Sequence, residues 1–204
     1  MERKTQSGYL LLADISGYTS FVATTEIEHA DVVLSFLLEN IVETLSACLT
    51  ISKLEGDAVF CYCEAGKLPE GKSLLDLIDH TYLTFRDKAQ ELWTEATCGC
   101  KACKAIPTLD LKFMVHHGDF IIQKVAGIKD LLGTDVNLIH RLAKNHVTES
   151  TGWQGYALFT HQGLEQMQAE KHAFVQQIES YEHLGDIETY VVDMHARYEA
   201  MKAS

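Results

Sequence analysis

Two aspartates stand where their carboxylates could share a metal ion. Asp14 ends the apolar run 9–14, and Asp57 stands between the short apolar runs 49–53 and 58–63. If these runs form neighbouring strands, the two carboxylates converge at one end of a sheet, where they repel each other unless a cation or a proton lies between them. Hard oxygen ligands of this kind suit Mg²⁺ or Mn²⁺. Taken singly, each aspartate has a more ordinary role in capping a helix or making a turn.

Three cysteines form a second group with possible chemistry. Cys98, Cys100 and Cys103 lie within six residues of one another. Thiols at this spacing could supply three ligands to Zn²⁺, form a redox pair, or remain free in a surface loop. The sequence does not reveal a fourth ligand, and the candidates are a residue of a partner chain or one of His116, His117, Cys61 and Cys63.

The spacing of apolar residues predicts the elements that position these side chains. Helical spacing predicts helices over 27–48, 73–95, 136–144 and 161–169. Apolar and alternating runs predict strands over 9–14, 49–53, 58–63, 109–115, 120–126, 155–159, 174–181 and 188–193. We expect residues 98–107 to form a loop. The order predicts an α+β protein with a ferredoxin-like βαββαβ core and additional strands and helices, an arrangement that by itself indicates no activity.

Length and charge limit the classes of partner. A chain of 204 residues suits a single domain over 1–204, with a small cysteine-rich insert around 96–107. Its 17 basic and 29 acidic residues give a net charge of −12, which disfavours nucleic acid and anionic membranes as partners. No apolar stretch approaches the roughly 20 residues that span a bilayer. The polar start, residues 1–7, is followed by an apolar run too short for a signal peptide. We expect a cytoplasmic protein.

Three segments resemble, in order, the motifs of class III adenylate and guanylate cyclase catalytic domains. Residues 12–19 (LADISGYT) resemble the first metal-binding motif, and residues 53–57 (KLEGD) resemble the second. Residues 130–142 resemble the third motif, in which Asp, Asn and Arg keep set intervals. The resemblance extends from about Gly8 to about Asp193. With its cysteine-bearing insert, the chain is most similar to a stand-alone bacterial cyclase-like family.

The resemblance implies roles for the first two motifs. Asp14 and Asp57, with the backbone carbonyl of Ile15, would bind two Mg²⁺ or Mn²⁺ ions per site. The loop that opens the next helix would offer backbone N–H groups to the triphosphate. That loop contains Gly17, Tyr18 and Thr19.

The resemblance also implies roles for four residues that contact the nucleotide. Lys53 and Asp130 would recognise adenine, because the lysine donates a hydrogen bond to a ring nitrogen and the aspartate accepts one from the exocyclic amine. Asn137 would orient the ribose, and Arg141 would stabilise charge on the transferring phosphate. In the family each site lies between two chains, with the metals on one chain and the base-reading residues on the other. A homodimer with two sites is therefore implied.

The implied function is conversion of ATP to 3′,5′-cyclic AMP and pyrophosphate at this interface. One alternative is a catalytically weak or inactive domain that acts as a nucleotide-binding or metal- or redox-sensing interaction module. Another is a cyclase acting on a different base. The family often has a phosphate-contacting lysine near Gly185, whereas this chain has none among Glu182, His183, Leu184 and Glu188. That departure favours the weak or inactive alternative.

Overall fold

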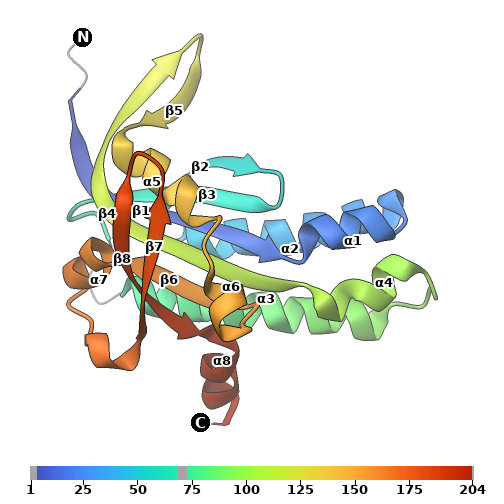
Figure 1. Ribbon diagram of the computed structural model, residues 1–204. Helices are drawn as coiled ribbons and strands as arrows, with labels where there is room; N and C mark the ends of the chain where they lie inside the picture. The colour runs from blue at the N-terminus through green and yellow to red at the C-terminus, as the bar shows by residue number, and fades with distance from the viewer. Residues whose placement is uncertain (1–3, 69–72, 204) are drawn as a thin grey trace.

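Figure 1 shows the computed structural model of the chain, which describes residues 4–68 and 73–203. Part of the polar start, residues 1–3, lies outside the described residues. The strands are β1 (Gln6–Ser16), β2 (Thr50–Glu55), β3 (Ala58–Glu64), β4 (Asp110–Val125), β5 (Ile128–Leu132), β6 (Tyr156–Thr160), β7 (Val175–Tyr181) and β8 (Gly185–Asp193). The helices are α1 (Tyr18–Thr24), α2 (Ile27–Ser46), α3 (Leu74–Glu95), α4 (Lys101–Ala105), α5 (Thr134–Leu142), α6 (Val147–Thr151), α7 (His161–Gln166) and α8 (Met194–Ala203). Two 3-10 turns are η1 (Ile106–Thr108) and η2 (Lys171–Ala173).

The sheet confirms the predicted ferredoxin-like core within an α+β protein. Its strands follow the order β2-β3-β1-β4-β6-β8-β7, and β5 pairs with β4 outside this path. The first four strands are antiparallel to their neighbours, whereas β6 runs parallel to β4. The two crossovers of the core are α2, between β1 and β2, and α3, between β3 and β4. The central strand β1 therefore lies between two strands from later parts of the chain.

Both faces of the sheet are covered, which explains why β1 reads as a continuous apolar run. Successive side chains of a strand point to opposite faces. Leu11 and Ala13 belong to the core cluster formed with α2 and α3, whose helices lie side by side in Figure 1. Leu10 and Leu12 belong to the cluster formed with α5. The alternation places Asp14 on the same face as α5.

Short elements differ from the sequence prediction. The expected loop at 98–107 contains the helix α4 and the turn η1. The two strands predicted at 109–115 and 120–126 are one strand, β4, which continues through Gly118 because β1 pairs with it on both sides of that glycine. The strand β5 and the helices α6 and α8 were not predicted. The helix expected after the loop at 16–19 is α1, which begins within that loop at Tyr18. The two long helices, the β2–β3 hairpin and the β7–β8 pair are confirmed.

No helix within the described residues has the length and apolar character needed to cross a lipid bilayer.

Candidate active site

The structure brings Asp14 and Asp57 together at one end of the sheet. Asp14 lies near the end of β1, with Ala58 of β3 and Lys112 of β4 opposite it. Asp57 forms the β2–β3 turn with Gly56, whose φ of 68° favours glycine. The Ile15 N–H donates to the Asp57 carbonyl over 3.2 Å, which fixes the turn against β1. The two carboxyl groups line the same cavity and are close enough for the charge of Asp14 to act on Asp57.

The closeness of these carboxyl groups is costly when both are ionised. Burial, followed by the negative charge of Asp14, raises the pKa of Asp57 to about 6. The ammonium of Lys112 lies 3.3 Å from Asp14 Oδ2 and offsets part of the repulsion. A pair of oxygen donors that must share a proton or a cation fits the ligand preference of Mg²⁺ and Mn²⁺. The residues present therefore suit a divalent metal site.

A cavity of about 410 Å³ opens beside the carboxylate pair. Asp14 and Asp57 line it together with Lys53, Glu55 and His140. Its volume lies within the range of roughly 300–1,000 Å³ found for small-molecule sites. The lining is mainly polar and has more acidic than basic side chains, so an anionic ligand would bind there only together with a cation.

Lys53 and Asp130, which lie 77 residues apart in sequence, are also in contact. The Lys53 ammonium donates to Asp130 Oδ1 at 3.2 Å and lies 3.1 Å from Glu55 Oε1. Burial opposes the charge of Lys53, but the hydrogen bonds with Glu55 and Asp130 raise the pKa of its ammonium. Burial likewise opposes the charge of Asp130, but the Leu131 N–H and Lys53 together lower the pKa of its carboxyl group. Both groups are therefore charged at neutral pH.

His140 is a site residue that the sequence interpretation missed. Its Nδ1 lies 3.2 Å from Glu55 Oε2, and its ring contacts the ring of Phe60 with centroids 4.8 Å apart. Burial lowers the pKa of His140 below its usual range. The imidazole is therefore neutral at physiological pH. It stands directly before Arg141 in the third motif, but that position does not indicate where its ring points.

Asn137 and Arg141 lie one helical turn apart on α5, and both are exposed. They line a separate cavity of about 360 Å³ with His140 and with His183 of the β7–β8 turn. Asp14 and Asp57 do not line this cavity. Within one chain, His140 is the residue common to the two cavities, and the structure does not bring Arg141 to the carboxylate pair.

The loop after Asp14 has a backbone that requires glycine. Gly17 is the N-cap of α1 with φ of 86°, and a Cβ atom on it would lie 2.9 Å from the carbonyl oxygen of Thr108. Tyr18 is partly buried against the core, Thr19 is exposed, and the Ile15 side chain is buried. The turn η1 therefore supports the loop that was predicted to hold the triphosphate.

The three cysteines of the insert lie outside this site, beside α2. His29 is the fourth side chain of this group. None of the four expected residues of this chain, His116, His117, Cys61 and Cys63, belongs to it. His116 is buried and hydrogen-bonds to Thr160 with a Nδ1–Oγ1 distance of 2.8 Å. Cys61 and Cys63 lie in β3, and His117 lies beside Tyr9 of β1. No sequence spacing links His29 to the insert, because the two segments lie about 70 residues apart.

Comparisons with known proteins identify related sequences and folds. Residues 34–151 match the sequence model of a family described as "Protein of unknown function (DUF2652)". The uncharacterized protein Rv2561/Rv2562 of Mycobacterium tuberculosis (strain ATCC 25618 / H37Rv) is 32% identical over 114 residues, which cover 56% of this chain and 52% of that protein. The chain thus spans about half the length of this curated relative.

Solved structures of cyclases share the fold. The guanylyl cyclase Cya2 matches with a TM-score of 0.73 and 16% identity over 94% of each chain. A bacterial light-regulated adenylyl cyclase matches with a TM-score of 0.69 and 16% identity, over 100% of this chain and 58% of that one. The predicted class III nucleotidyl cyclase fold is confirmed. Because adenylyl and guanylyl cyclases both match, the fold alone does not select a base.

Proposed function

The chain belongs to the DUF2652 family, whose description assigns no function, and we propose that it is a nucleotidyl cyclase that forms 3′,5′-cyclic AMP and pyrophosphate from ATP. The observation that carries the proposal is that Asp14 and Asp57 line one cavity together with Lys53, which pairs with Asp130. Each pair joins segments that are remote in sequence. We place this activity in the cytoplasm, where nucleoside triphosphates are available.

Asp14 and Asp57 would hold two Mg²⁺ or Mn²⁺ ions, with the Ile15 carbonyl as a further ligand. When bound, divalent ions make a hydroxyl a better nucleophile and offset the charge of the leaving pyrophosphate. The chain's own contribution is to present the two carboxylates side by side, one from the end of β1 and one from the β2–β3 turn that is hydrogen-bonded to β1. The backbone of Gly17, Tyr18 and Thr19 follows directly and would contact the triphosphate.

The contacts of Lys53 and Asp130 leave groups for an adenine base. An ammonium has three N–H donors, and Lys53 directs two of them to Glu55 Oε1 and Asp130 Oδ1. The hydrogen bonds to Asp130 from Lys53 and from the Leu131 N–H both use Oδ1. One Lys53 N–H can therefore donate to a ring nitrogen, and Asp130 Oδ2 can accept from the exocyclic amine. Guanine presents the opposite pattern at these edges, and such fixed groups discriminate by roughly 10⁴-fold.

Two copies of the chain are needed to complete this site. Asn137 and Arg141 line a different cavity from Asp14 and Asp57. Within the described residues, no carboxylate pairs with the Arg141 guanidinium, which is exposed. In a homodimer, Arg141 of one copy would stabilise charge on the phosphate held by the aspartates of the other, and Asn137 would orient the ribose.

A product assay tests the proposal. Purified protein is incubated with Mn²⁺ and each of the four common nucleoside triphosphates, and cyclic products are identified by mass. We expect cyclic AMP from ATP, its loss by at least about 10³-fold in Asp57→Ala, and unchanged activity in Asp31→Ala, which removes an exposed carboxylate on α2. A different cyclic nucleotide as the main product would contradict the proposed role of Lys53 and Asp130.

A nucleotide-binding module without catalysis is the second candidate. Glu182, rather than a lysine, lines the cavity of Arg141, so the local positive charge is reduced. Saturable ATP binding without any cyclic product in the same assay would favour this candidate over the first.

A further inference from the structure

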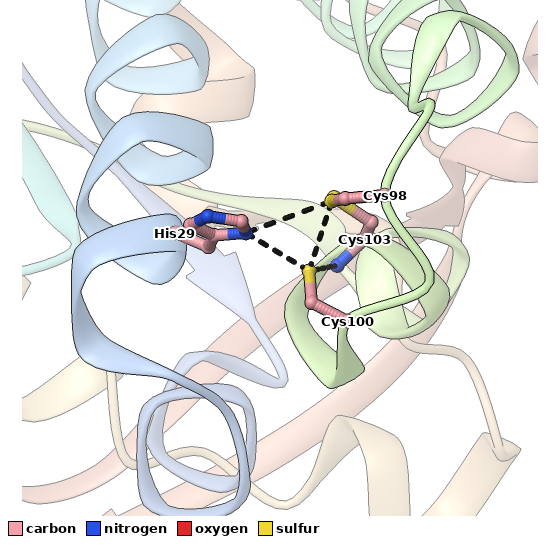
Figure 2. Close-up of side chains that lie close together, drawn as sticks. All are labelled: His29, Cys98, Cys100 and Cys103. Carbon is pink, nitrogen blue, oxygen red and sulfur yellow. Dashed lines mark hydrogen bonds between the residues drawn. The ribbon is translucent and has the colours of Figure 1, made fainter.

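Four side chains with metal-binding atoms meet at one end of the α2–α3 helix pair. His29 lies in the first turn of α2, and Cys98 lies in the segment between α3 and α4. Cys100 is the N-cap of α4, and Cys103 lies within that helix. Figure 2 shows the imidazole pointing from α2 toward the thiols. This group, His29, Cys98, Cys100 and Cys103, is referred to as the His–Cys cluster.

The distances within the His–Cys cluster match a single shared ion. His29 Nδ1 lies 3.0 Å from Cys100 Sγ and 3.6 Å from Cys98 Sγ. Cys98 Sγ lies 3.3 Å from Cys100 Sγ and 3.0 Å from Cys103 Sγ. All four donor atoms lie within 4.8 Å of one another. Four ligands about 2.3 Å from one tetrahedral centre lie about 3.8 Å apart, so small side-chain shifts would admit an ion.

We propose that His29, Cys98, Cys100 and Cys103 bind one Zn²⁺ ion per chain. Three thiolates and one imidazole form a ligand set that suits tetrahedral zinc and is unsuited to Mg²⁺, which prefers oxygen. Because all four positions are filled by side chains, the zinc is structural and has no open position for a substrate. This site is separate from the carboxylate pair in ligand chemistry and in location.

The backbone around the His–Cys cluster is already held in place. The Cys103 N–H donates to Cys100 Sγ at 3.3 Å. The Glu26 carboxylate, three residues before His29, accepts from the N–H groups of Lys101 and Ala102 at 3.0 and 3.2 Å. These bonds fix α4 relative to α2 independently of any metal. The ligands therefore need little reorganisation to bind.

The zinc would add a further link between α2 and α4, beside the hydrogen bonds of Glu26. Ala102 of α4 and Ile106 of η1 are buried in the core, so this segment is already anchored there. A zinc ion bound by His29 and the three cysteines would tie α2 to it. The carbonyl oxygen of Thr108, two residues after Ile106, lies beside Gly17 in the loop that follows Asp14. Zinc loss should therefore loosen the support of that loop. The expected effect of zinc loss on catalysis rests on the proposed function. The expected metal content and the effect of zinc loss on stability do not.

Metal analysis tests the site without nucleotide. Protein purified under reducing conditions should contain about one zinc per chain, and Cys100→Ser and His29→Ala should reduce this to below about one tenth. Cys48→Ser is the matched control, because it removes a partly exposed thiol that follows the far end of α2 and should leave the zinc content unchanged. Removal of zinc by a chelator should lower the melting temperature, and added Zn²⁺ should restore it.

Cobalt gives a second readout that requires no variant. Wild-type protein stripped of metal and titrated with Co²⁺ should bind one equivalent and develop sulfur-to-cobalt charge-transfer absorption. Absence of that band, iron in place of zinc, or a Cys98–Cys103 disulfide with a mass two units lower and no metal would each overturn the proposal. Zinc retained by folded Cys100→Ser and His29→Ala would also overturn the proposal. An inactive protein that contains one zinc would contradict only the proposed function.

Discussion

Asp57 has a carboxyl group that the folded chain makes harder to ionise than the unfolded chain does. Burial and the charge of Asp14 raise its pKa to about 6, against 3.8 as the ordinary value. Between these two values the native state binds more protons than the unfolded state, so the free energy of unfolding decreases as pH rises through this window. Above pH 6 the protein carries the full cost of two neighbouring carboxylates, unless a divalent ion is bound.

Replacing Asp57 by asparagine should therefore stabilise the protein in a pH-dependent way. Without added divalent ions, we expect Asp57→Asn to raise the melting temperature by roughly 2–4 °C at pH 8, the effect of about 1 kcal/mol in a domain of this size. The gain should vanish near pH 4, where the native carboxyl group is already protonated. Thermal unfolding at both pH values measures the difference. An equal gain at the two pH values would exclude carboxylate repulsion as the cause.

Some of the site residues could be predicted from the sequence, and others could not. Asp14 and Asp57 were expected to converge because each stands next to a short apolar run, so the prediction required only that two strands be neighbours. His29 and Lys112 carry no local signal, since each stands on a long element and acquires its neighbours through the tertiary fold. Recognising His140 would have required knowing which face of α5 meets β3.

At the scale of elements, α8 is held to α3 by a partly buried ion pair. Arg197 Nε donates to Asp79 Oδ1 at 2.7 Å, and the Arg197 guanidinium also bonds to Asp79 Oδ2. The Asp79 side chain is only 12% exposed. Removing the cation would leave a largely buried carboxylate without its partner, which is more costly than losing an exposed ion pair.

Arg197→Met should therefore destabilise the protein by about 2–4 kcal/mol. Lys202→Met is the matched control, because Lys202 lies on the same helix and pairs with Asp87 at the surface, with about half of each side chain exposed. We expect that control to cost less than about 1 kcal/mol. Urea unfolding curves measure both changes. Equal losses in the two variants would show that burial of Asp79 does not determine the cost.

Long and short elements differed in how well the sequence predicted them. The helices α2 and α3 are long enough for several apolar repeats, which made their spacing distinct from that of a strand. The helices α1, α4 and α6 have seven, five and five residues, too few to establish a period. The strand β4 was predicted as two because Gly118 suggested a break. Pairing with β1 across that glycine keeps the strand continuous.

At the scale of the whole molecule, the division of the site between two cavities predicts complementation between chains. Asp57→Ala and Arg141→Ala should each be inactive as homodimers. In an equal mixture, half of the dimers contain one of each chain, and each such dimer has one complete site out of two. We therefore expect about a quarter of the wild-type activity after subunit exchange. Cyclic AMP formation by the mixture measures it.

The double variant Asp57→Ala/Arg141→Ala controls for this experiment, because mixing it with either single variant gives no complete site. Activity that stays at the background of the single variants after demonstrated exchange would mean that one chain supplies the whole site. Light scattering of the wild type should show a dimer at the concentrations used in the assay.

The central position of β1 has a consequence for how fragments of this protein are designed. The strand lies between β3 and β4, and its register with β4 joins residues about 100 positions apart. The stretch that matches the family, 34–151, begins after this strand has ended. A fragment trimmed to that stretch would lose the middle of its own sheet and one of the two aspartates. The homologous stretch is therefore too short a unit to express, and the N-terminal strand must be kept with it.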